Sequence, residues 1–346
     1  MTTTPCPGAP ARPLRRARAA AGAAFFLQGL VFISVTQRLP EIKRTWDLGE
    51  LAVSGLLLMV VLLAGIGSAA RELGARRWTS AAVLRIGCIL TVIGLGTLGG
   101  IVATLGAITA AGLPLRWALP PMLAIPLVVA FAPFLPRDVE LPVLDRESAV
   151  PWRPILLVGA ALVAFYMVDT AATTWGPVYL HDLFGTSDRL LPFATLPYLV
   201  ATLAARLGGD RLVLRVGAVR LLRIGGVLAA LALAVVVLAP NAPTAVVGFF
   251  LLGTAVATIA PLSYSAAAVL AGGTGSPEAR RARVDAVIAR FNQFNYVGAL
   301  LGAVLTGVAG AGSLRYGYVV PMVLVLAMVP LARHFAVIDR GLSASD

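Results

Sequence analysis

Residues 155–180 read ILLVGAALVAFYMVDTAATTWGPVYL, a run in which Asp169 is the only charged side chain. An α-helix needs about 20 apolar residues to cross the hydrocarbon core of a bilayer, because its backbone N–H and C=O groups must all be paired within the segment. The run is long enough to cross, and it places a carboxyl group at membrane depth. We therefore predict that residues 155–180 form a transmembrane helix.

Segments of the same kind fill most of the remaining chain. The 346 residues are 59% hydrophobic and only 13% charged, with a mean hydropathy of +0.89. A soluble protein of this length would carry more charge and a periodic alternation of apolar and polar residues. We predict an all-α polytopic membrane protein whose spans lie near 19–36, 51–70, 78–113, 117–135, 155–180, 188–208, 219–239, 243–270, 285–311 and 315–335.

The distribution of arginine orients these spans. The net charge is +12, and the arginines cluster in connections between spans rather than along one face of a soluble element. This arrangement is typical of the positive-inside bias and does not indicate a nucleic-acid partner. We expect a protein of the cell (inner) membrane with both termini in the cytoplasm and the lipid bilayer around it. The connection after the first span is an exception because it carries Arg38, Lys43 and Arg44 on the outer side.

A polar stretch divides the chain into two halves. We expect a basic cytoplasmic tail (1–18), an N-terminal half of about four spans (19–135), a central cytoplasmic linker (136–154), a C-terminal half of six spans (155–336) and a cytoplasmic tail (337–346). The run 78–113 is too long for one upright crossing and short for two, at about 1.5 Å of rise per residue. One crossing gives ten spans, and two crossings give eleven and would invert the second half against its arginine distribution.

Two glycine- and arginine-rich segments stand at matching places in the halves. The first is GSAARELGARR at 67–77, and the second is GGDRLVLRVGAVR at 208–220. We interpret both as tight cytoplasmic turns between helices, because glycine permits close backbone approach and arginine anchors helix ends at the inner leaflet. Such pairing favours a parallel internal repeat.

At these residues the chain resembles the major facilitator superfamily, which carries G-x-x-x-D-R-x-G-x-R-R between its second and third helices. The stretch from Asp169 to Leu180 and residues 37–42 are most similar to the bacterial fucose-permease-like branch. The resemblance implies a two-half helical bundle, shortened here because the family's fourth helix is missing from the run 78–113. It also implies gating loops formed by Gly67, Arg71, Glu72, Gly74, Arg76 and Arg77 and by Gly209, Asp210, Arg211 and Arg215, with the family's Asp-Arg pair replaced by Arg71-Glu72.

Polar residues inside the spans supply the candidate binding site. An ionisable residue at membrane depth is costly and is by default a functional candidate, which makes Asp169 the strongest one. Tyr166 and Thr173 share a helical face with it by i, i+3, i+7 spacing. The remaining candidates for substrate or proton binding are Trp175, Gln28, Asn292, Asn295 and Tyr264. Each has a structural alternative: in-helix hydrogen bonding for the hydroxyls and interfacial anchoring for Trp175.

The predicted function is secondary active transport of a small solute by alternating access, coupled to protons. A truncated relic or regulatory membrane subunit that does not transport is the alternative, since the missing helix lines the cavity in the family. We do not expect an enzyme, because the sequence has neither H-E-x-x-H nor G-x-S-x-G, and we expect no cofactor and no metal site. The sequence alone does not choose between uptake and efflux.

Overall fold

The computed structural model describes residues 39–45, 47–59, 62, 150–187, 190–273 and 276–343. Contacts divide the chain into two compact units, and all of these residues belong to the unit made of 36–66 and 141–346. Several sequence predictions lie outside the described residues. They are the number of crossings in 78–113, Gln28, and the first-half loop residues Gly67, Arg71, Glu72, Gly74, Arg76 and Arg77.

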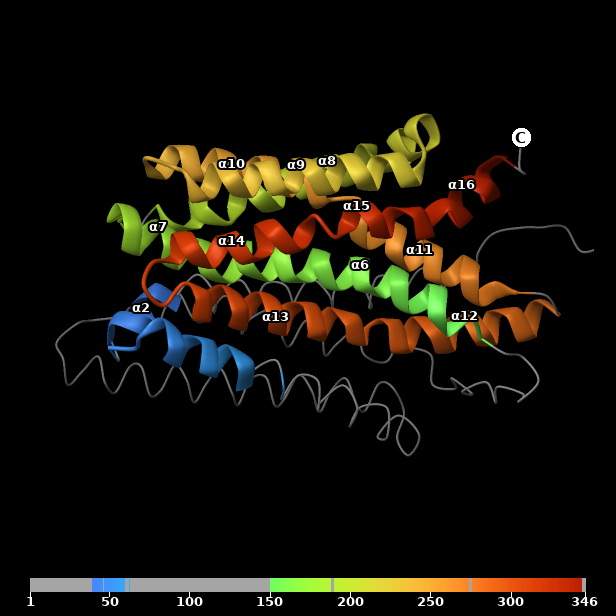
Figure 1. The fold of residues 1–346 in the computed structure, drawn as a ribbon, viewed down its shortest axis with the longest axis horizontal. Helices are drawn as coiled ribbons and strands as arrows, with labels where there is room; N and C mark the ends of the chain where they lie inside the picture. The colour runs from blue at the N-terminus through green and yellow to red at the C-terminus, as the bar shows by residue number, and fades with distance from the viewer. Residues whose placement is uncertain are drawn as a thin grey trace, which may run out of the picture. The chain divides into compact units, whose positions relative to one another are not determined.

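The described part of the chain is helical throughout and contains no strand, which confirms the all-α prediction (Figure 1). Two of the described helices precede the linker: α2 (Leu39–Thr45) and the helix Glu50–Met59. The helices of the second half follow as α6 (Trp152–Thr170), the π-helix η3 (Ala171–Trp175), α7 (Gly176–Phe184), the 3₁₀ turn η4 (Leu191–Ala194), α8 (Leu196–Val216), α9 (Ala218–Val237), α10 (Ala242–Val256), α11 (Ile259–Gly272), α12 (Pro277–Phe291), α13 (Gln293–Ala309), α14 (Leu314–Val325), α15 (Met328–Leu331), the 3₁₀ turn η5 (Ala332–Phe335) and α16 (Ala336–Ser343).

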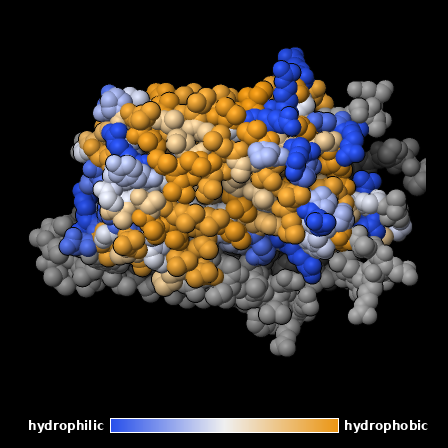
Figure 2. All heavy atoms as spheres, viewed as in Figure 1, coloured by the Kyte–Doolittle hydropathy of each residue, from blue (hydrophilic) through white to orange (hydrophobic). Residues whose placement is uncertain are grey.

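Many of these helices join end to end into long apolar rods. Among the described residues, four rods are long and apolar enough to cross a membrane: Trp152–Phe184, Ala218–Val237, Ala242–Gly272 and Leu314–Arg340. Apolar residues cover the middle of the visible surface, and hydrophilic residues gather toward its two ends (Figure 2). The chain is a multi-pass membrane protein, because an apolar belt of this kind is stable only against lipid.

The two ends of this unit differ in charge. One end, here called the arginine-rich end, holds the start of α6, the α8–α9 turn, the α11–α12 connection and α16 (Figure 1). The other end, here called the α7 end, holds the end of α7, α2, and the connections 238–241 and 310–313. A cation at this second end, Arg315, donates to the carbonyls of Val237 and Ala239 and so caps the last turn of α9.

The turn predicted in the second glycine-rich segment lies near the end of that segment, and the residues assigned to it from the sequence are helical. Gly209, Asp210, Arg211 and Arg215 lie inside α8, which continues to Val216, and the chain turns at Gly217 instead. Gly217 has a φ of 83°, which glycine adopts without strain. A tertiary contact stabilises this turn: the carboxylate of Asp339 on α16 accepts from the backbone N–H groups of Ala218 (2.6 Å) and Val219 (3.3 Å). Gly208 and Gly209 lie within α8 and do not form the turn.

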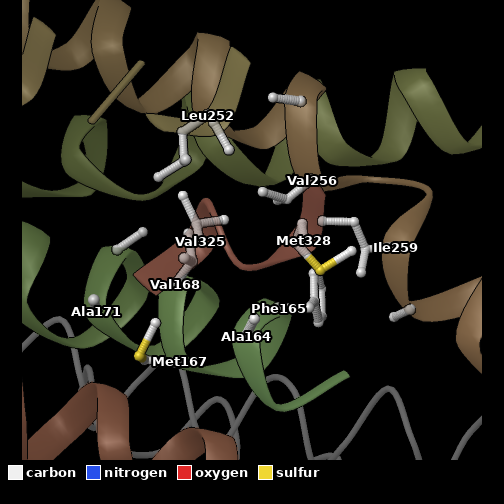
Figure 3. Close-up of a cluster of buried hydrophobic side chains, with 14 of the residues drawn as sticks. Ala164, Phe165, Met167, Val168, Ala171, Leu252, Val256, Ile259, Val325 and Met328 are labelled. Carbon is white, nitrogen blue, oxygen red and sulfur yellow. The ribbon is translucent and has the colours of Figure 1, made fainter. Parts of the chain in front are cut away.

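Small residues let α13 approach α6 closely. A β-carbon placed on Gly298 or Gly302 of α13 would overlap backbone atoms of Val163 or Met167 on α6. On the other side of α6, a buried apolar cluster fills the centre of the unit, with side chains from α6, α10, α11, α14 and α15 (Figure 3). This packing holds α6, and therefore Asp169, in a fixed place at the middle of the bundle.

Candidate functional site

Asp169 lies near the middle of the rod Trp152–Phe184, about 25 Å along the helix from Trp152. Its Oδ1 accepts a hydrogen bond of 2.7 Å from the hydroxyl of Tyr198, which is fully buried on α8. A hydrogen bond to an ionised acceptor is stronger than one between neutral groups. The contact joins α6 to α8 through a carboxyl group at membrane depth.

The sequence does not indicate Tyr198 as a member of the site. Charged side chains inside the spans, and polar residues close to them in sequence, mark the candidates, whereas Tyr198 lies 29 positions after Asp169. One available signal was its place: a tyrosine at the start of a span must find a partner for its hydroxyl if it points into the bundle. The partner itself could not be read from the spacing, because α8 is a separate helix.

Arg206 is the second group that the sequence did not assign to the site. It lies on α8 two turns after Tyr198, and its Nε donates to the carbonyl of Ala257 (3.1 Å), where α10 gives way to α11. Its guanidinium lies 5.9 Å from the ring centre of Phe165 on α6 and interacts electrostatically with Asp169. A positive charge near the carboxylate favours its ionised form at a depth where an isolated charge is costly.

Tyr166 and Tyr264 extend the polar cluster along α6 and α11. Tyr166, one turn before Asp169, interacts electrostatically with both Asp169 and Tyr264. The Tyr264 hydroxyl donates to Oδ1 of Asn292, which connects α12 to α13 (3.1 Å). The structure thus brings together four of the candidates predicted from the sequence, which are Asp169, Tyr166, Tyr264 and Asn292. Their hydroxyl and amide groups can donate to and accept from a polar solute.

Thr173 and Trp175 donate their side-chain hydrogen bonds to backbone carbonyls. The Thr173 hydroxyl donates to the carbonyl of Asp169 (2.7 Å), and the Trp175 indole N–H donates to the carbonyl of Ala303 on α13 (2.9 Å). Trp175 is completely buried, so it does not lie at an interface with solvent. Both belong to the π-helix η3, in which the carbonyl of Ala171 accepts from the Tyr318 hydroxyl (3.0 Å). Irregular turns of this kind inside α-helices often occur at functional sites.

The remaining candidates are spread more widely. Asn295 lies on the first turn of α13, partly buried, and its backbone N–H donates to the carbonyl of Asn292. On α8, Gly209 packs against Thr258, while Arg211 and Arg215 are exposed near the arginine-rich end. These three residues of α8 do not join the Asp169 cluster.

No family model matches the chain. An uncharacterized transporter of Sinorhizobium fredii is 33% identical over 141 residues, which cover 39% of this chain and 37% of that protein. An uncharacterized MFS-type transporter of Yersinia pestis is 25% identical over 180 residues, covering 52% and 44%. The matched regions therefore span less than half the length of these relatives.

Solved structures match over nearly the whole chain. The nucleoside transporter NupG is 13% identical with a TM-score of 0.56, covering 94% of this chain and 98% of that one. A bacterial homologue of the human lysosomal transporter Spinster is 14% identical with a TM-score of 0.59 and the same coverage. At such low identity these two likenesses concern the fold alone.

Proposed function

We propose that this chain, which has the fold of the major facilitator superfamily, is a secondary active transporter of a small solute. The proposed mechanism is alternating access, in which the solute site opens to one side of the membrane and then to the other. Protons are the proposed coupling ion. The observation that carries the proposal is the Asp169–Tyr198 hydrogen bond, because it places a titratable carboxyl group at the middle of a membrane-embedded bundle.

The chemistry of the cluster supports coupling to protons. An ionised Asp169 can only accept hydrogen bonds, and it accepts one from Tyr198. A protonated Asp169 would become a donor as well and would lose its attraction to Arg206. One proton therefore changes both the charge and the hydrogen-bonding pattern that join α6 to α8. Such a change can bias the relative position of these helices and make it depend on the proton gradient.

Tyr166, Tyr264 and Asn292 are the proposed solute-binding groups. Their hydroxyl and amide groups suit an uncharged solute with several hydroxyl or amide groups, such as a sugar or a nucleoside. We also propose that the arginine-rich end faces the cytoplasm, as the positive-inside bias predicts. Labelling of a cysteine in the 136–154 linker from the cytoplasmic side alone is the expected result for this orientation.

The test of function is solute accumulation in proteoliposomes with an imposed pH gradient. Purified protein is screened against radiolabelled hexoses, nucleosides and amino acids, and a hit is defined as saturable accumulation that collapses with a protonophore. The substitution Asp169→Asn keeps the size of the side chain and removes its titration. We expect it to abolish gradient-driven accumulation while exchange of solute without a gradient persists.

The matched control is Asp285→Asn, the same change at an exposed residue of α12. We expect this variant to accumulate solute as the unsubstituted protein does. Unchanged accumulation in Asp169→Asn, with an unchanged pH profile, would remove Asp169 from the mechanism. The absence of saturable flux for every solute class would instead favour the alternative function, a membrane subunit that does not transport.

A further inference from the structure

A glycine on α10 brings that helix against the backbone of α8 at the level of the site. A β-carbon placed on Gly253 would overlap the carbonyl oxygen of Tyr198 and would lie 3.0 Å from the hydroxyl of Thr202. That hydroxyl donates to the carbonyl of Tyr198 at 2.8 Å and to the carbonyl of Gly253 at 3.2 Å. The two helices therefore touch at the residue whose side chain binds Asp169.

A second contact joins the same two segments one helical turn further on. The carbonyl of Ala257 would normally accept from the N–H four residues later, but that residue is Pro261, which has no N–H. The Nε of Arg206 donates to this carbonyl instead, at 3.1 Å. Arg206 follows Thr202 by four residues, and Ala257 follows Gly253 by four residues. Two contacts in register fix the position of α8 along α10 as well as the distance between them.

The same stretch of α10 also belongs to the apolar cluster at the centre of the unit. Leu252 and Val256 are completely buried there (Figure 3). The cluster includes Phe165 and Val168 of α6, and Val168 is the residue immediately before Asp169. Close-packed side chains of this kind leave little freedom for one helix to shift against another. The position of α10 is therefore fixed within the core that holds Asp169, and α10 in turn fixes α8.

The link between α6 and α8 is made by the ends of side chains. The Tyr198 hydroxyl donates to Asp169 at 2.7 Å, and the guanidinium of Arg206 lies 5.9 Å from the ring centre of Phe165. An O–H···O bond forms only between about 2.5 and 3.0 Å. Because Tyr198 is fully buried, its ring cannot swing freely to follow a displaced backbone. The hydrogen bond therefore depends on where α10 holds α8.

We propose that Gly253 and Thr202 are positioning residues, which hold α8 at the distance from which the Tyr198 hydroxyl reaches Asp169. Gly253 does so because it has no side chain, and Thr202 does so through the hydroxyl that it shares between the two helices. The inference rests on the proposed function only for the use of the Tyr198–Asp169 hydrogen bond in proton coupling. The geometry can be tested without any solute, so its failure and the failure of transport are separate results.

Gly253→Ala is the perturbation that follows from this geometry. Non-bonded heavy atoms pack at about 3.5 Å, so the added methyl group must push the carbonyl of Tyr198 away by about 1 Å. A shift of this size exceeds the spread of about 0.5 Å between short and long O–H···O bonds. The Tyr198 hydroxyl then no longer lies at bonding distance from Asp169, although both residues are still present.

The experiment measures the coupling between Tyr198 and Asp169 by a double-mutant cycle of Tyr198→Phe and Asp169→Ala. The full chain is unfolded with sodium dodecyl sulfate in mixed micelles, and the equilibrium constant is compared among the variants. We expect a coupling of about tenfold or more in the unsubstituted protein, as for a hydrogen bond to a charged group. In the Gly253→Ala background we expect less than about twofold, which is the scatter of independent sites. A residue with a structural role alone would lower stability and leave the coupling unchanged.

The matched control is Gly225→Ala on α9. A β-carbon on Gly225 would lie 2.8 Å from the carbonyl oxygen of Ala255 on α10, so it makes the same kind of overlap with α10 from α9 instead of α8. We expect Gly225→Ala to lower stability and to keep the coupling of about tenfold. Loss of the coupling in Gly225→Ala as well as in Gly253→Ala would overturn the inference, because any loosening around α10 would then be sufficient.

A pair of changes at Thr202 gives a second measurement that does not require Gly253→Ala to fold. Thr202→Val keeps the branched shape and removes the hydroxyl, whereas Thr202→Ser keeps the hydroxyl. We expect the coupling to fall about threefold or more in Thr202→Val and to be retained in Thr202→Ser. Full coupling in Gly253→Ala overturns the inference. Where that variant does not fold, equal coupling in Thr202→Val and Thr202→Ser overturns it.

Discussion

Replacing Tyr198 by phenylalanine removes one oxygen atom and leaves a ring of the same shape. Tyr198 is fully buried, so the phenylalanine ring occupies the same space without a cavity. The lost contact is the hydrogen bond of 2.7 Å to the Asp169 carboxyl group. The effect of the substitution therefore measures the value of this contact.

The magnitude follows from the charge of the acceptor. A hydrogen bond to a charged group contributes about 1.5–3 kcal/mol, against about 1 kcal/mol for a neutral pair. We expect Tyr198→Phe to lower the free energy of unfolding by about 1.5–3 kcal/mol, which is a factor of about 10 to 150 in the equilibrium constant. A loss below about 1 kcal/mol would indicate that Asp169 is neutral when Tyr198 binds it.

The assay is unfolding of purified protein in mixed micelles titrated with sodium dodecyl sulfate and followed by tryptophan fluorescence. A double-mutant cycle with Asp169→Ala isolates the pair, since alanine offers no acceptor. We expect the double variant to be about as stable as Asp169→Ala alone, because the tyrosine then has no partner left to lose. The control is Tyr316→Phe, which changes a tyrosine that is 68% exposed and should shift stability by less than about 0.5 kcal/mol.

Additive effects of the two substitutions would refute the reasoning, because they would show that Tyr198 and Asp169 contribute independently. The same cycle applied to solute accumulation connects structure with function. Tyr198→Phe should reduce gradient-driven accumulation in the unsubstituted background and have no further effect in Asp169→Asn. Full accumulation in Tyr198→Phe would remove the tyrosine from the coupling mechanism.

Two further predictions concern the contacts that position the site. Gly302→Ala places a methyl group against the carbonyl of Met167 and should lower the free energy of unfolding by about 1–3 kcal/mol through overpacking. The control is Gly208→Ala, at a helical glycine with open space around it, which should be neutral or slightly stabilising. Equal losses in both variants would contradict close packing of α13 on α6. Asp339→Ala removes the acceptor for two N–H groups at the start of α9 and should cost about 0.5–2 kcal/mol in the same unfolding assay. Asp285→Ala, an exposed acid on α12, is its control, and an equal loss there would show that Asp339 does not act as a cap.

The sequence was sufficient to predict that the chain is helical and spans the membrane. Apolar runs such as 155–180 must be helical in lipid, because the α-helix is the conformation in which one segment pairs its own backbone groups. The residues at which the helices end could not be predicted as well. The segment at 208–216 contains glycine and charge in the pattern of a turn, yet α8 continues through it to Val216. The turn is at Gly217, and the carboxylate of Asp339, 121 residues after Ala218, accepts from the first N–H groups of α9 that follow it.

The same division applies to the site. Asp169 could be singled out as a candidate from the sequence alone, because a carboxyl group inside an apolar run is costly. Tyr166 and Thr173 followed from the period of one helix. Tyr198 and Arg206 did not, since their relation to Asp169 arises from the packing of α8 against α6 and not from any spacing in the chain.

The amino-acid sequence thus defines properties that lie within single segments: that long apolar runs cross the membrane, and which of them carries an acid at membrane depth. The packing of the helices defines which side chains on other helices meet that acid, where α8 ends, and that Lys43 of the first half binds Asp182 of the second. The difference lies in the range of the interactions. Burial in lipid acts on each helix separately, whereas hydrogen bonds and ion pairs act over about 3 Å between helices whose order in space the sequence does not state.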